Sequence, residues 1–148
     1  MSVKKELLKD HDALEKTIVE RFLGIPYACK GRDPKTGLDC WGLALCVYEM
    51  LGVKLFDLDV DYDVKWHEKG GNYLAENLWR DWEPVAKPEF LGTVLFLSME
   101  GVAYHGGICL RDGKFIHGTK KGVIVSRFSE PMLLSKVEGY YRLKKLYE

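Results

Sequence analysis

The 148-residue sequence lacks three features that would point to a specialised partner or compartment. It has no excess of charge, because 22 Lys and Arg residues balance 22 Asp and Glu residues, and so it lacks the basic surface typical of nucleic-acid-binding proteins. It has no apolar run long enough to span a bilayer. Charged residues also interrupt positions 1–10 before the apolar part of an export signal could form. We therefore expect a protein made in a reducing cytoplasm, with no nucleic-acid partner and no insertion into a membrane.

Paired C-x-x-C spacing is missing as well. The four cysteines are Cys29, Cys40, Cys46 and Cys109, and their spacing does not match a zinc site. In a reducing compartment we expect free thiols rather than disulfides, and we expect neither a metal ion nor another cofactor. Cys46 and Cys109 fit small groups in or near the core, whereas the role of Cys29 stays open.

A partial calcium-loop pattern is the one metal alternative. Asp57, Asp59 and Asp61, with Glu68 at the twelfth position, follow the ligand spacing of an EF-hand loop. The sixth position holds Tyr62, where the sharp turn of that loop requires glycine. Apolar residues at alternate positions favour instead an extended segment with one buried face.

Length and composition predict one domain, residues 1–148, whose hydrophobic content of 47% is sufficient for a packed core. An apolar stripe predicts a helix over residues 2–23, with residues 1–12 as an N-terminal helical extension, and a shorter helix is predicted over residues 72–82. From Gly92 onward the apolar period is two, which predicts strands at residues 93–98, 103–110, 114–119, 122–126 and 139–143. The fold class is therefore α+β, with N-terminal helices packed on a C-terminal antiparallel sheet.

A further predicted helix begins at Cys40. Asp39 has the side chain of a good N-cap, and Gly52 stands where a left-handed residue usually ends a helix. A cysteine at the first helical position lies at the positive end of the helix dipole, which favours the nucleophilic thiolate over the thiol. Cys40 is therefore a candidate nucleophile. The basic loop before it, residues 28–38, is either one wall of a cleft or a simple surface connection.

Two histidines occur in the predicted sheet, His105 in Tyr-His-Gly-Gly-Ile and His117 in Phe-Ile-His-Gly-Thr. A single histidine in a strand is usually structural. A thiol nucleophile, however, needs a base to accept its proton, and the base needs a third polar group that fixes its tautomer. Cys40, His105 and His117 supply these three groups, and Gly106 leaves the backbone beside His105 open to a substrate.

The turn between the two histidine strands tests this assignment, because side chains alternate between the faces of a sheet. A two-residue Asp112-Gly113 loop would put His105 and His117 on opposite faces. A three-residue loop, with a type I turn and Gly113 at positive φ, would put them on one face as diagonal neighbours. We predict the three-residue loop, with both rings facing the Cys40 helix.

Together these motifs resemble the NlpC/P60 family of cysteine peptidases over residues 14–143. The resemblance rests on Gly24-Ile-Pro-Tyr27, Asp39-Cys-Trp-Gly-Leu, His105-Gly-Gly-Ile and Phe115-Ile-His117. It implies a papain-like α+β fold and cleavage of a peptidoglycan stem peptide, often between D-glutamate and a diamino acid. By position, the resemblance makes Cys40 the nucleophile, His105 the general base and His117 the orienting residue. It also implies substrate contacts for Tyr27, Asp39 and Trp41.

Two positions depart from the common pattern of this family. Trp41 stands where many cell-wall enzymes have serine, and Thr93 stands where Asp usually follows Gly92. The Asp-Cys-Trp-Gly-Leu form is similar to phage tail-associated members, which implies phage tail proteins as partners and the virion tail as the alternative location. Two other functions stay open: a thiol acyltransferase or amidase acting on a non-wall substrate, and a non-catalytic phage tail-assembly module.

Overall fold

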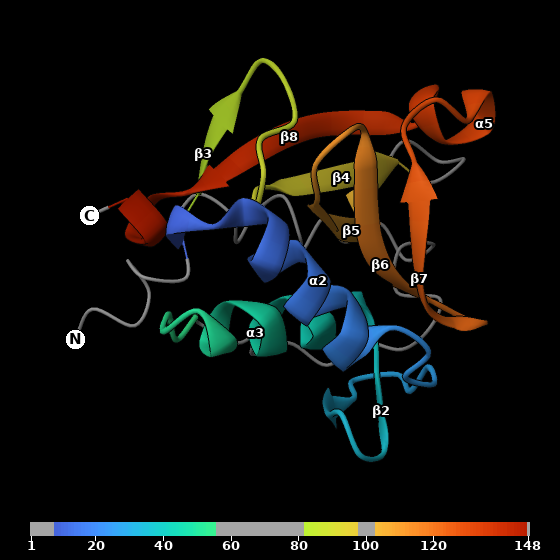
Figure 1. Ribbon diagram of the computed structural model, residues 1–148. Helices are drawn as coiled ribbons and strands as arrows, with labels where there is room; N and C mark the ends of the chain where they lie inside the picture. The colour runs from blue at the N-terminus through green and yellow to red at the C-terminus, as the bar shows by residue number, and fades with distance from the viewer. Residues whose placement is uncertain (1–7, 56–81, 98–102, 148) are drawn as a thin grey trace.

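Six strands form the main sheet in the order β3-β8-β4-β5-β6-β7, with every neighbouring pair antiparallel (Figure 1). The computed structural model describes residues 8–55, 82–97 and 103–147. The strands of this sheet are β3 (Trp82–Val85), β4 (Thr93–Leu97), β5 (Ala103–Cys109), β6 (Lys114–Thr119), β7 (Gly122–Arg127) and β8 (Val137–Leu143). The helices are α2 (His11–Phe22), α3 (Cys40–Met50), the short α5 (Pro131–Leu134) and the 3₁₀ helix η2 (Lys144–Tyr147). Long helices thus precede an antiparallel sheet, which is the α+β arrangement that the sequence predicts.

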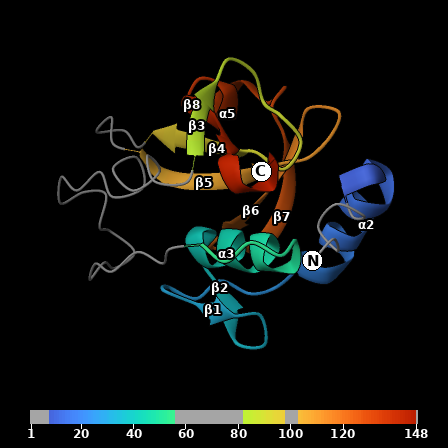
Figure 2. The same cartoon turned by 90° about the vertical axis from the view of Figure 1, so that its left-hand side faces the viewer.

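The two faces of the sheet carry separate apolar clusters. On one face, Leu95, Ile108 and Ile116 pack with the buried residues of α2 and α3. Figure 2 shows α3 running along this face of the sheet. On the other face, Phe96 and Phe115 belong to a second cluster, which we call the aromatic cluster (Val94, Phe96, Cys109, Phe115 and Phe128). Since side chains alternate along a strand, odd and even positions join different clusters.

α2 begins later than predicted. Asp10 caps it with a carboxylate oxygen that accepts a hydrogen bond from the Ala13 N–H at 3.0 Å. The single helix predicted over residues 2–23 is therefore wrong, because Asp10 separates helical residues 8–9 from α2. The apolar stripe itself is confirmed at Leu14, Ile18 and Phe22, which are all buried. The stripe alone could not reveal the break, since a capping aspartate and a surface aspartate fit the same helical pattern.

α3 closely matches the predicted helix. Asp39 caps its first turn by accepting a hydrogen bond from the Gly42 N–H at 2.8 Å. Gly52 follows the helix with φ +87°, the left-handed conformation that the prediction assigned to it. Leu43 and Val47 are buried against the sheet, so the helix is held along its length and its first residue has a defined place.

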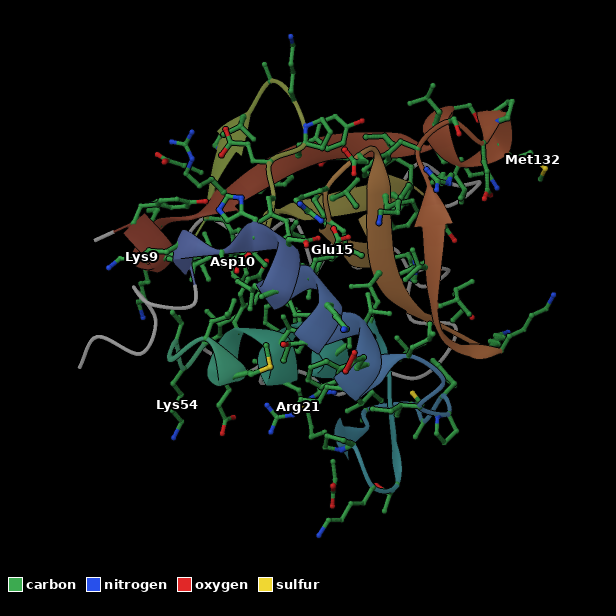
Figure 3. All side chains as sticks on the ribbon, in the orientation of Figure 1. Lys9, Asp10, Glu15, Arg21, Lys54 and Met132 are labelled. Carbon is green, nitrogen blue, oxygen red and sulfur yellow. The ribbon has the colours of Figure 1, made fainter. Side chains whose placement is uncertain are left out.

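A buried glutamate ties α2 to the β5–β6 hairpin. Glu15 accepts hydrogen bonds from the Arg111 backbone N–H at 2.6 Å and from the Lys114 ammonium at 2.8 Å. Figure 3 labels Glu15 on α2, and Arg111 also pairs with Asp12 of this helix. Burial alone would raise the pKa of Glu15, but the two donors and the two cations outweigh burial and hold this pKa below its usual value. The carboxylate therefore stays charged and fixes the hairpin against the helix.

The β5–β6 hairpin has the predicted three-residue loop. Cys109 pairs with Phe115, and Gly113 has φ +71°. The predicted type I turn is wrong, because Asp112 also has a positive φ, +58°, whereas both central residues of a type I turn have negative values. Aspartate tolerates this region of backbone space, so the register is the predicted one although the turn type is not.

Several smaller predictions change. Trp82, predicted to end a helix, begins the edge strand β3, and the rest of that helix prediction, residues 72–81, lies outside the described residues. The loop predicted over residues 28–38 contains a two-stranded ribbon of β1 (Arg32–Asp33) and β2 (Gly37–Leu38). The calcium-loop alternative at residues 57–68 also falls outside the described part of the chain. Within that part, no helix combines the length and the apolar character needed to span a bilayer.

Candidate active site

Cys40 is the first residue of α3, and its half-buried thiol accepts hydrogen bonds from the backbone N–H groups of Gly106 and Trp41. A glycine in β6 permits this end of the helix to approach the sheet closely. A Cβ on Gly118 would lie 3.2 Å from the Asp39 carbonyl carbon and 3.4 Å from the Cys40 nitrogen. The first turn of α3 therefore reaches β5 at Gly106 and β6 at Gly118, the residues that follow the two histidines in sequence.

His105 and His117 lie on the same face of the sheet, as predicted. The Nε2 atom of His105 is 2.7 Å from the Nδ1 atom of His117, a hydrogen bond between the two rings. His117 is buried, and its ring contacts Phe115 with the centroids 4.6 Å apart. His105 pairs with Phe96 across β4. Both histidines therefore belong to the face that carries the aromatic cluster.

We predicted that both histidine rings face the Cys40 helix. This is wrong for most of α3, which lies on the other face of the sheet from the two rings. α3 packs on the opposite face, where Ile108 and Ile116 join its cluster. Alternation within strands shows which residues share a face, but it does not show which face a helix covers. Cys40 meets the histidine strands only through the end of α3, at the two glycines described above.

Burial makes the neutral forms of all three groups the stable ones. It raises the pKa of the Cys40 thiol to about 12, and the Asp39 carboxylate adds to this effect, while hydrogen bonding from Gly106 opposes it. Burial also lowers the pKa of His105 to about 4 and that of His117 to about 3. Burial and the adjacent carboxylate thus oppose the effect of the helix end, which favours the thiolate, and the predicted thiolate stays a prediction.

Asp39 directs its carboxylate at donors of its own chain. One oxygen accepts hydrogen bonds from the Gly42 N–H and, at 3.0 Å, from the Arg32 guanidinium. The other accepts the Lys30 N–H at 2.9 Å. These bonds fasten the residue 28–38 segment to the first turn of α3, so Asp39 positions the chain around Cys40. The substrate contact assigned to Asp39 stays a prediction.

Comparison with known proteins decides the family. The profile of the NlpC/P60 family matches residues 24–142. The chain belongs to the NlpC/P60 family. It is 30% identical over 133 residues to the gamma-DL-glutamyl hydrolase of Bacillus subtilis (strain 168), a match that covers 86% of this chain and 28% of that protein. It is also 30% identical over 130 residues to the probable endopeptidase YafL of Escherichia coli (strain K12), covering 84% of this chain and 47% of YafL.

This NlpC/P60 chain thus spans less than half the length of either curated relative. Among solved structures, a protein similar to lipoproteins from Staphylococcus aureus, of the NLP/P60 family, matches with a TM-score of 0.65 and 17% identity. That match covers 96% of this chain and 41% of the other. The likeness confirms the predicted papain-like α+β fold.

Tyr27 lies close to Cys40, the candidate nucleophile of this NlpC/P60 chain. It forms an isolated parallel bridge with Leu38, immediately before the cap of α3. Burial raises the pKa of its hydroxyl to about 12, and the neighbouring Cys29, Asp39 and Cys40 contribute to the rise. The Tyr27 hydroxyl therefore shares the environment of the Cys40 thiol.

Trp41 and Gly106 line a small cavity beside Cys40. Trp41 is buried, so it supplies an apolar wall rather than an exposed surface. Thr93, which departs from the common family pattern, lines the same cavity, and its hydroxyl is 3.0 Å from the Tyr48 hydroxyl. The structure therefore brings the predicted Tyr27, Trp41 and Gly106 to the neighbourhood of the thiol.

Sequence reasoning missed Ser126. Its Oγ lies 2.9 Å from the Nε2 atom of His117, and the residue is buried. No local motif marks this serine. The signal that could have found it is register: a two-residue turn closed by Thr119 and Gly122 places Ser126 opposite Phe115, on the histidine face.

The other three cysteines differ in burial. Cys109 is buried in the aromatic cluster, and Cys46 is half-buried with its thiol donating to the Arg32 carbonyl oxygen at 3.6 Å. Both placements confirm the prediction of core or near-core groups. Cys29 is exposed in the segment before β1, and all four thiols are free.

Proposed function

We propose that this chain is a cysteine peptidase that hydrolyses an amide bond in the stem peptide of bacterial peptidoglycan, between D-glutamate and a diamino acid. The observation that carries the proposal is the 2.7 Å contact between His105 Nε2 and His117 Nδ1, on the two strands that the Cys40 end of α3 approaches. A nucleophile, a base and an orienting group are the set that acyl transfer by a thiol requires. The name of one relative, a gamma-DL-glutamyl hydrolase, supports a glutamyl bond, and that of the other, a probable endopeptidase, supports hydrolysis of a peptide.

In the proposed reaction the Cys40 thiol attacks the carbonyl carbon of the scissile bond while His105 accepts the thiol proton. Because the pKa of the thiol is raised and that of the imidazole is lowered, proton transfer accompanies the attack rather than preceding it. The backbone N–H of Cys40, at the N-terminus of α3, stabilises the oxyanion. His105 then gives its proton to the leaving amine, and attack by water on the thioester releases the acyl group and restores the thiol.

The proposed substrate contacts are Tyr27, Trp41 and the backbone of Gly106, because these groups surround the thiol. Asp39 contributes indirectly, since it holds the residue 28–38 segment beside the helix end. The apolar wall that Trp41 provides excludes water from one side of the reacting sulfur.

Purified muropeptides of defined stem composition test the proposal. In H₂¹⁸O, hydrolysis puts one ¹⁸O atom into the new carboxylate, whereas transfer to another acceptor does not, so fragment masses separate a peptidase from an acyltransferase. Cys40→Ala should lower the rate by roughly a thousandfold or more. Cys46→Ala is the matched control. Its half-buried thiol donates a hydrogen bond to the Arg32 carbonyl oxygen and packs against the core, so its loss should leave the rate unchanged. Full activity in Cys40→Ala would contradict the proposal, as would products without ¹⁸O.

The residue after the nucleophile supports a second, narrower proposal, namely that the protein is phage tail-associated and is made in the cytoplasm before assembly. Trp41 takes the place of a more common serine and is buried beside the thiol. Mass spectrometry of purified virions from the source strain would detect the chain in stoichiometric amount. Its absence from virions, with normal amounts in the host cell, would contradict the tail location.

A further inference from the structure

Ser126 extends the histidine pair by one more hydrogen bond. Its Oγ lies 2.9 Å from His117 Nε2, while the other ring nitrogen of His117 contacts His105. Ser126 and His117 are 9% and 4% exposed. Antiparallel pairing of β6 with β7 puts Ser126 opposite Phe115, so it is a diagonal neighbour of His117 on the aromatic face. Three polar side chains from three strands therefore form one hydrogen-bonded chain in apolar surroundings.

We propose that Ser126 is a positioning residue that accepts the Nε2 proton of His117 and thereby fixes the tautomers of both histidines. The inference rests on the proposed function, in which His105 accepts the proton of Cys40. Because the Nε2 atom of His105 contacts His117, the proposed function requires Nδ1 of His105 to accept that proton. Nδ1 can accept only when the ring proton of His105 is on Nε2, where it is donated to His117 Nδ1. His117 then carries its own proton on Nε2 and needs an acceptor there, which Ser126 supplies.

If the two hydrogen bonds ran in the opposite direction, from Ser126 to His117 to His105, His105 could not act as the base. If Ser126 donated its proton to His117 Nε2, His117 would be protonated at Nδ1 and would donate to His105 Nε2. His105 would then hold its proton on Nδ1, the wrong tautomer for accepting a proton from the thiol. A buried hydroxyl is costly unless it is hydrogen-bonded, so Ser126 and His117 each stabilise the other in this apolar environment.

Three substitutions of Ser126 separate the effect of its strength as a hydrogen-bond acceptor from the effect of its size and shape. Ser126→Ala removes the acceptor, Ser126→Cys keeps the shape with a weaker acceptor, and Ser126→Thr retains the hydroxyl. Long-range ¹H–¹⁵N NMR of histidine-labelled protein reports the tautomer of each ring without any substrate. We expect Nε2-protonated rings for His105 and His117 in the wild type and in Ser126→Thr. In Ser126→Ala and Ser126→Cys, the His117 signals should move toward the Nδ1-protonated form.

Kinetics on muropeptides provide the second readout. Loss of the acceptor should lower kcat about tenfold with little change in KM, since the hydrogen bond acts on the base rather than on the substrate. Ser126→Thr should recover most of this loss. Ser135→Ala, which removes a surface hydroxyl bonded to the Met132 carbonyl oxygen, is the control and should match the wild type.

Wild-type tautomers in both Ser126→Ala and Ser126→Cys would overturn the proposal. If Ser126→Ala does not fold in thermal unfolding measurements, Ser126→Cys supplies the same comparison with less loss of volume. The NMR result does not depend on the substrate. A wild type that ignores muropeptides would therefore count against the proposed function, whereas unchanged tautomers would count against the role of Ser126.

Discussion

The substitution Gly107→Ala tests whether the hydrogen bond between His105 and His117 requires a residue without a side chain at position 107. A Cβ there would lie 2.9 Å from Phe115 Cδ2 and 3.2 Å from both His117 Cβ and the Ile116 carbonyl oxygen. Two of these three atoms move only with the β6 backbone, so relief of the clash displaces His117 from His105. Overpacking of this kind costs about 1–3 kcal/mol. For a domain of this size we expect the melting temperature of Gly107→Ala to fall by about 3–10 °C.

Gly106→Ala is the matched control, because the neighbouring position points to the other face. A Cβ on Gly106 would lie 3.3 Å from the end of the Leu95 side chain and 3.5 Å from the Val94 carbonyl oxygen. A flexible side chain can yield at the first contact, so the fall in melting temperature should be less than half that of Gly107→Ala. Thermal unfolding gives the stability, and imidazole ¹⁵N shifts report the hydrogen bond between the rings. Equal effects of the two substitutions on both readouts would refute the reasoning.

Two further substitutions address the charges around the hairpin and the thiol. Glu15→Gln should lower the free energy of unfolding by about 1–3 kcal/mol at pH 7. The pKa of Glu15 in the folded protein lies below the usual value of 4.5. The stabilisation by the Glu15 carboxylate is therefore fully present above pH 4.5 and is lost as the pH falls through the folded pKa. In urea unfolding, the difference in stability between the wild type and Glu15→Gln should therefore be smaller at pH 3 than at pH 7. Glu20→Gln is the control: Glu20 is exposed and lies 3.9 Å from Lys16, so its substitution should change the stability little at either pH. Asp39→Asn removes a charge that raises the pKa of Cys40, so iodoacetamide should alkylate Cys40 faster at pH 8, and an unchanged rate would show that burial alone sets the pKa.

Local patterns predicted the elements that hold the site. The Asp39 and Gly52 ends of α3 follow from capping chemistry, which depends on neighbours in sequence. The shared face of His105 and His117 follows from alternation and from the length of one loop. Each of these inferences needs only residues within one helix or one hairpin, and each is right in the structure.

The inferences that failed needed distant parts of the chain. Trp82 begins a strand because β8 pairs with it, and its own neighbours in sequence contain no sign of that partner. The face of the sheet that α3 covers depends on how the whole helix layer docks. Ser126 belongs to the site because β7 adds to the sheet in one particular register.

The surroundings of Cys40 show why position and reactivity are coupled in this site. Asp39 holds Arg32 at 3.0 Å and fastens the preceding segment to α3, so it is needed to place the thiol. The same carboxylate raises the pKa of Cys40, whereas the Arg32 guanidinium lowers it. Since the two charges oppose each other, burial remains the dominant influence, and it favours the thiol. The burial and the carboxylate that fix the place of Cys40 at the end of α3 are therefore the same two influences that raise the pKa of its thiol.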